Sequence, residues 1–172
     1  PIHAGCYERY NSKAQTQVEY LAQQRKDLGR TIDYLKQRGD IDLQKLSFVG
    51  FSSGAKDGIN LVAVESRISV AVFVHGGLPR NPDINQAVSG VNFAPHVKVP
   101  ALMLNGRNDF IFPAETSQRP LFELLGTSPS DKDYRVFEGG HNVPLDMQIQ
   151  ETTGWLDRYL GTPPKVDELK RP

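Results

Sequence analysis

The 172-residue sequence predicts the α/β fold class, with a parallel sheet between two layers of helices. Four short runs rich in β-branched and aromatic residues alternate with helical patterns, and this alternation is typical of parallel βαβ units. The run Val70–Val74 contains no polar residue, as expected of a strand that is buried on both faces. A chain of this length can form one hydrophobic core. We therefore expect a three-layer domain with about four strands.

The expected strands and helices alternate along the whole chain. Apolar residues spaced by three or four predict a first helix, from about Val18 to Leu35, that ends at Gly39. A second helix should begin directly after Ser52. The domain should cover residues 1–161, followed by an extended tail over 162–172 that is rich in proline and charge. The remaining expected elements are strands at Leu46–Phe51, Val70–Val74, Ala101–Leu104 and Tyr134–Phe137, a helix at about 114–125 broken at Pro120, and a helix at about 145–160 that stops at Gly161.

Composition excludes several classes of partner. The chain has 20 basic and 20 acidic residues, so it lacks the positive charge that nucleic acids or acidic membrane surfaces attract. Its longest clean apolar run, Ile68–Val74, is far shorter than the roughly 18 residues of a membrane helix. Cys6 is the single cysteine, and no cluster of ligand residues has metal-binding spacing. We expect no metal, no cofactor and, without a signal-peptide pattern, a cytoplasmic location.

The stretch LSFVGFSSGA, residues 46–55, places Gly-x-Ser-x-Gly between an expected strand and an expected helix. This is the context of a nucleophile elbow, in which a strained turn exposes a serine oxygen at the carboxyl edge of the sheet. Outside that context the motif is a weak signal, and a plain turn serine is the alternative. We predict Ser52 as a nucleophile.

Two further polar residues follow expected strands. Asp109 comes just after the strand at 101–104, and His141 follows the strand at 134–137 and two glycines. Sites in open parallel sheets form outside the carboxyl ends of strands, so both side chains should lie near Ser52. The alternatives are a loop-capping Asp109, with Asp83 as the acid instead, and a surface His141. The order Ser52, Asp109, His141 is that of nucleophile, acid and base in α/β-hydrolases, so we expect His141 to activate Ser52 and Asp109 to orient His141.

The motifs GFSSGA, LMLNGRND and FEGGHN, in this order, resemble the carboxyl-terminal half of an α/β-hydrolase. The dienelactone-hydrolase-like and prolyl-oligopeptidase-like branches are the most similar, over residues of about 5–161. Residues 92–126 and the closing GWLDRYLG also resemble hydrolase domains that are sometimes joined to bacterial protein kinases. The resemblance implies a serine hydrolase that cleaves small-molecule carboxylic esters or lactones through an acyl-enzyme on Ser52. A serine peptidase similar to prolyl oligopeptidase is the alternative.

The resemblance also implies parts that this sequence lacks. An oxyanion hole needs the N–H of Ser53 and a second donor, which in this family comes from a loop before the nucleophile. His75-Gly76-Gly77 follows the nucleophile and does not match that loop, so we expect His75 to line the edge of the substrate pocket or to lie in a strand-end turn. Tyr7-Glu8-Arg9 resembles a family stretch near the rim of the active site, which implies a pocket role for Tyr7, and a surface salt-bridged turn is the alternative. We expect the second donor from an amino-terminal half, in the same protein or in a second chain. A non-catalytic fragment that binds that half remains an alternative, and a homo-oligomer is left open.

Overall fold

The computed structural model describes residues 14–80 and 85–163. Its centre is a sheet of four parallel strands in the order β1-β2-β3-β4, so that neighbours in the chain are neighbours in the sheet. The strands are β1 (Ser47–Phe51), β2 (Val70–Val74), β3 (Ala101–Gly106) and β4 (Lys132–Phe137). All four lie where the sequence predicts them, although β3 and β4 are longer than expected. The parallel α/β prediction is therefore confirmed.

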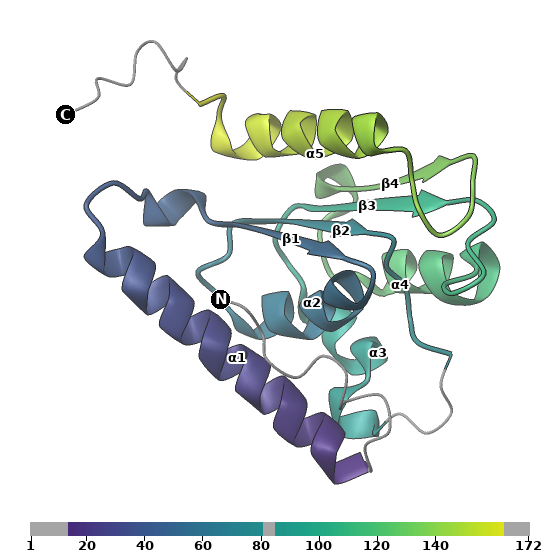
Figure 1. The fold of residues 1–172 in the computed structure, drawn as a ribbon, viewed down its shortest axis with the longest axis horizontal. Coiled ribbons are helices and arrows are strands. Elements are labelled where there is room, and N and C mark those ends of the chain that lie inside the picture. Colours follow the sequence, from purple (N-terminus) through teal and green to yellow (C-terminus); the bar gives the residue numbers. More distant parts are fainter. Residues whose placement is uncertain (1–13, 81–84, 164–172) are drawn as a thin grey trace.

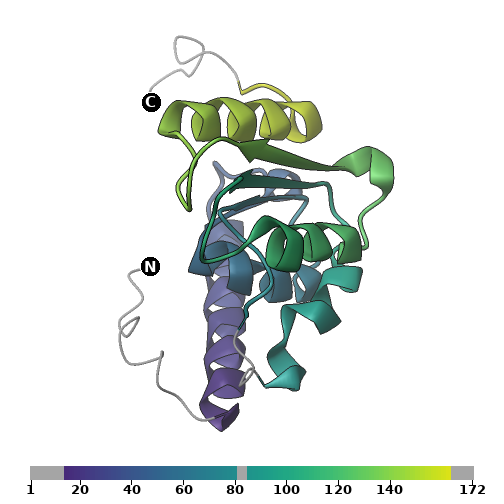
Figure 2. The same cartoon turned by 90° about the vertical axis from the view of Figure 1, so that its right-hand side faces the viewer.

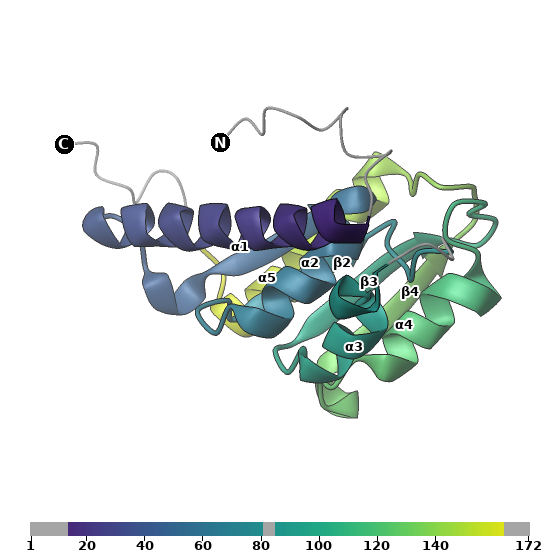
Figure 3. The same ribbon diagram turned by 90° about the horizontal axis from the view of Figure 1, so that it is seen from below.

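Helices cover both faces of this sheet (Figure 1). Helices α1 (Ala14–Gln37), α2 (Ser53–Val64), α3 (Gly90–Phe93) and α4 (Arg119–Leu124) lie on one side, as the view from below shows (Figure 3). Helix α5 (Leu145–Leu160) lies on the opposite side (Figure 2). Short 3-10 segments occur at Leu43–Lys45, Gln86–Val88, Ala94–His96 and Pro129–Asp131. Within the described part of the chain, no helix is long and apolar enough to cross a bilayer.

The two faces of the sheet build separate cores, because alternate side chains of a strand point to opposite faces. Ala71, Phe73 and Met103 point toward the side of α1, α2 and α4. Val72 and Leu102 point the other way and pack with the buried Trp155 of α5. The strands β2 and β3 are fully buried, which explains why they have almost no polar residues.

Two details of the expected helices are wrong: the cap at Gly39 and the position of the break in the segment 114–125. Helix α1 ends at Gln37, and Gly39 does not adopt the left-handed conformation of a helix-capping glycine. The segment 114–125 does change its geometry, but before Pro120: a π-helical turn over Ala114–Gln118 leads into α4. Proline has no N–H to donate and is tolerated in the first turn of a helix, so α4 starts at Arg119 and contains Pro120 near its beginning.

Candidate functional site

Ser52 lies in the tight turn that joins β1 to α2. Its backbone has φ 51° and ψ −112°, an uncommon conformation for a residue with a side chain. The Ser52 N–H donates to the Val74 carbonyl oxygen at 2.8 Å and thereby ties the turn to the end of β2. Such strain persists only where the surrounding structure imposes it, and it often marks functional sites.

The two glycines around Ser52 have different roles. A Cβ on Gly50 would lie 2.6 Å from the carbonyl oxygen of Gly54, so β1 and α2 can approach closely only because Gly50 has no side chain. A Cβ on Gly54 would meet no atom within 4 Å. In this structure the first glycine of the motif is sterically required and the second is not.

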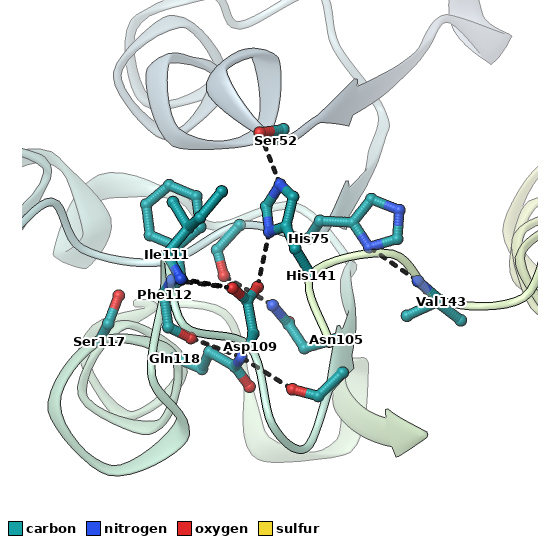
Figure 4. A network of polar contacts seen from close by, with 12 residues as sticks. Ser52, His75, Asn105, Asp109, Ile111, Phe112, Ser117, Gln118, His141 and Val143 are labelled. Carbon is teal, nitrogen blue, oxygen red and sulfur yellow. Dashed lines mark hydrogen bonds and ion pairs between the residues drawn. The ribbon is translucent and has the colours of Figure 1, made fainter. Parts of the chain in front are cut away.

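The structure brings the three predicted residues together (Figure 4). His141 Nε2 lies 2.9 Å from Ser52 Oγ, and His141 Nδ1 lies 2.8 Å from Asp109 Oδ2. The side chain of Asp109 is fully buried, whereas that of His141 is 14% exposed. A hydrogen-bonded line therefore runs from a buried carboxylate through an imidazole to a hydroxyl.

The loop after β3 holds Asp109 in place. Asp109 Oδ1 accepts the N–H groups of Ile111 at 2.8 Å and Phe112 at 3.0 Å, which leaves Oδ2 for His141 (Figure 4). Gln118 is fully buried, and its Nε2 donates to the carbonyl oxygens of Gly106 at 3.2 Å and Phe112 at 2.6 Å. Gln118 thus links the two ends of the loop that carries Asp109.

The loops that carry Asp109 and His141 are joined through their backbones. The Arg107 N–H donates to the Phe137 carbonyl oxygen at 2.8 Å, and the Asn108 N–H donates to that of Gly139 at 2.9 Å. A Cβ on Gly106 would overlap the carbonyl oxygen of Gly140. The absence of a side chain on Gly106 therefore lets the loops that carry the acid and the histidine approach each other.

His75 lies beside His141 at the end of β2. The two ring centroids are 5.5 Å apart, and the ring of Phe112 lies 6.0 Å from the His141 ring. His75 is 5% exposed and has a left-handed backbone with φ 57°. Burial lowers its pKa, and the nearby charge of His141 acts in the same direction against a smaller opposite effect of Asp109.

The remaining predicted site residues have different outcomes. Ser53 is the first residue of α2, and its N–H has no acceptor among residues 14–80 and 85–163. Tyr7 and the alternative acid Asp83 lie outside the described residues.

The sequence does not identify Gln118 as a site residue, because a polar residue in the stretch Thr116–Arg119 is typical of a solvent-exposed turn. Within the described residues, no group of three or more His, Cys, Asp or Glu side chains could hold a metal ion.

Comparison with solved structures gives several with the same fold. A cold-adapted esterase from an Arctic intertidal metagenomic library is 24% identical, with a TM-score of 0.67 over 81% of this chain and 59% of that one. Acetyl xylan esterase from Paenibacillus sp. R4 is 18% identical, with a TM-score of 0.68 over 81% of this chain and 53% of that one. Acylaminoacyl peptidase from Pyrococcus horikoshii is 14% identical, with a TM-score of 0.63 over 77% of this chain and 27% of that one.

These similarities show that the fold is that of the α/β-hydrolases. This chain spans little more than half the length of each of the two esterases. No curated protein matches the sequence. Among protein families, the dienelactone hydrolase family matches residues 6–141, a range that includes Ser52, Asp109 and His141. Because that match covers most of the 172 residues, the chain belongs to the dienelactone hydrolase family.

Proposed function

We propose that this chain carries the catalytic triad of a serine hydrolase that cleaves carboxylic esters or lactones. Ser52 is the nucleophile, His141 the general base and Asp109 the residue that orients His141. The observation that carries the proposal is the pair of contacts made by one imidazole, 2.9 Å to Ser52 Oγ and 2.8 Å to Asp109 Oδ2. Membership of the dienelactone hydrolase family supports a hydrolytic reaction.

The contacts suit acyl transfer. His141 Nε2 accepts the hydroxyl proton while Ser52 Oγ forms a bond to the carbonyl carbon of the ester. The bond from that carbon to the leaving oxygen then breaks, and His141 returns the proton to the departing alcohol. Water, activated by the same imidazole, next attacks the acyl-enzyme, which releases the carboxylic acid and regenerates Ser52. Throughout, Asp109 holds the proton-bearing Nδ1 and stabilises the imidazolium.

The oxyanion that forms in this reaction needs two donors, of which this chain supplies the Ser53 N–H at the start of α2. The amino end of a helix carries partial positive charge, which favours a negative oxygen at this position. We assign the second donor to residues outside the described ranges 14–80 and 85–163, in the same protein or in a second chain. Loss of one donor typically lowers kcat by about 10²–10³-fold, so a chain without it would be a weak enzyme.

Hydrolysis of p-nitrophenyl acetate by the full-length protein tests this function. Ser52→Ala should abolish turnover, whereas Ser53→Ala keeps its backbone N–H and should retain most of the activity. Turnover that survives Ser52→Ala would contradict the proposal. A parallel assay with a prolyl p-nitroanilide distinguishes the alternative, because faster cleavage of the amide would identify a peptidase.

A further inference from the structure

His75 is a second histidine in the site, and the triad chemistry leaves it without a role. Its imidazole is buried against that of His141, with the ring centroids 5.5 Å apart. Its Nδ1 accepts the N–H of Val143 at 3.4 Å, and Val143 lies two residues after His141 (Figure 4). His75 therefore contacts both the ring of His141 and the loop that carries it.

The backbone of His75 is held in its left-handed conformation from both sides. Its own N–H donates to the Leu104 carbonyl oxygen at 2.8 Å. The next residue, Gly76, accepts from Asn105 Nδ2 at 2.7 Å, and a Cβ on Gly76 would lie 2.7 Å from the Cβ of Ala55. The ends of β3 and α2 thus impose an unfavourable φ on a residue with a side chain, and such strain is retained where a specific side chain is needed.

The protonation state of His75 suits an acceptor. A histidine nitrogen can accept the Val143 N–H only while it carries no proton, so this bond requires the neutral ring with its proton on Nε2. Burial lowers the pKa of His75, and the charge of His141 opposes protonation further, while Asp109 favours it more weakly. A neutral neighbour also leaves His141 free to become the imidazolium that acylation requires.

We propose that His75 is a positioning residue, which holds the His141 loop through the Val143 N–H and the His141 ring so that His141 Nε2 stays on Ser52 Oγ. This inference rests on the proposed function, since it concerns the base of that reaction. His75 contacts no reacting atom in this role. It acts on the rate of acylation through the position of His141.

The test compares substitutions that keep or move the acceptor atom. In His75→Asn the amide oxygen takes the position of Nδ1, and asparagine tolerates the left-handed conformation. In His75→Gln the same amide lies one methylene farther from the backbone, away from Val143. His75→Gly removes the acceptor and relieves the strain. His96→Asn is the matched control, because His96 is exposed and lies in the 3-10 segment Ala94–His96 that precedes β3.

The measured quantity is the rate at which a fluorophosphonate labels the full-length protein, with thermal unfolding followed in parallel. His75→Gln and His75→Gly should label on the order of 10²-fold more slowly, as expected when a catalytic group is displaced by about 1 Å. His75→Asn should restore a rate close to that of the wild type and of His96→Asn, even if it unfolds at a temperature as low as the other two variants.

Each outcome has one meaning. Equal rates for His75→Asn and His75→Gln, whether both fast or both slow, would overturn the inference, because the position of the acceptor would then be irrelevant. Fast labelling of His75→Gly would overturn it too. If the wild type is not labelled, or if Ser52→Ala is labelled as fast as the wild type, the proposed function fails and the inference with it.

Discussion

Asp109 and His141 are joined by a hydrogen bond of 2.8 Å in which only one carboxylate oxygen of Asp109 takes part. The other oxygen accepts two backbone N–H groups, from Ile111 and Phe112. In the proposed mechanism this division of roles fixes the orientation of the carboxylate and, through it, the tautomer of the imidazole.

The first prediction concerns Asp109→Asn. The amide oxygen should keep the two backbone N–H groups, so the amide NH₂ will face His141 Nδ1. That nitrogen must then accept, which places the imidazole proton on Nε2, where it cannot take the proton of Ser52. We expect kcat to fall by roughly 10⁴-fold with little change in stability. Steady-state ester hydrolysis measures the effect, with the exposed Asp146→Asn as control. A fall of less than about tenfold would exclude this role for Asp109.

The second prediction concerns the two glycines around Ser52, because the structure predicts different effects on stability when each is replaced by alanine. Gly50→Ala would force its Cβ against the Gly54 carbonyl oxygen, and such overpacking costs about 1–3 kcal/mol. Gly54→Ala has open space in the first turn of α2, and it should be neutral or stabilise by up to about 1 kcal/mol. Urea unfolding of both variants measures these free energies. Equal destabilisation would show that the packing at Gly50 is not what this structure describes.

The third prediction concerns Gln118. Its side chain donates to the carbonyl oxygens of Gly106 and Phe112 and accepts the Tyr134 hydroxyl proton at 2.5 Å. Gln118→Leu would leave the Phe112 carbonyl oxygen without the Gln118 donor and the half-buried Tyr134 hydroxyl without its acceptor, while the Gly106 carbonyl oxygen would keep only the Asp109 N–H at 3.4 Å. We therefore expect a loss of about 2–3 kcal/mol and reduced activity as the Asp109 loop loosens. Thermal unfolding and ester hydrolysis test both effects. The exposed Gln150→Leu is the control, and a Gln118 variant as stable as this control would contradict the prediction.

The fourth prediction concerns pH. Burial lowers the pKa of His75 below its ordinary value of 6.5, so in the window between the two pKa values the unfolded chain binds a proton that the folded protein does not. The free energy of unfolding therefore rises with pH across this window. Keeping His75 neutral in the folded protein costs no stability above pH 6.5, and this cost grows as the pH falls below 6.5.

His75→Asn removes this titration. Between pH 7.5 and pH 5.5, chosen to bracket a value of about 6.5, the wild type should lose more stability than the variant in urea unfolding. Identical losses in the wild type and His75→Asn would show that His75 ionises equally well in the folded and unfolded states.

The elements that the sequence predicted best are those in which local pattern and tertiary packing agree. The apolar runs of β2 and β3 and the position of Ser52 between β1 and α2 follow from burial and from Gly-x-Ser-x-Gly. Convergence of Asp109 and His141 followed from the rule that the carboxyl ends of parallel strands share one edge.

Other features depend on contacts between segments far apart in the chain. The difference between Gly50 and Gly54 depends on the approach of α2 to β1, which no local pattern contains. The hydrogen bonds of Gln118 and the place of His75 beside His141 likewise depend on tertiary packing. The pocket role expected of Tyr7 stays a prediction, because Tyr7 lies outside the described residues.

The central claim is that Ser52 is the nucleophile activated by His141. Its most direct test is to label the full-length protein with a fluorophosphonate, digest it and map the modified peptide by mass spectrometry. We expect one label per chain, on Ser52 and not on the adjacent Ser53, with labelling lost in His141→Ala. A label on another residue, or undiminished labelling of Ser52 in His141→Ala, would contradict the account.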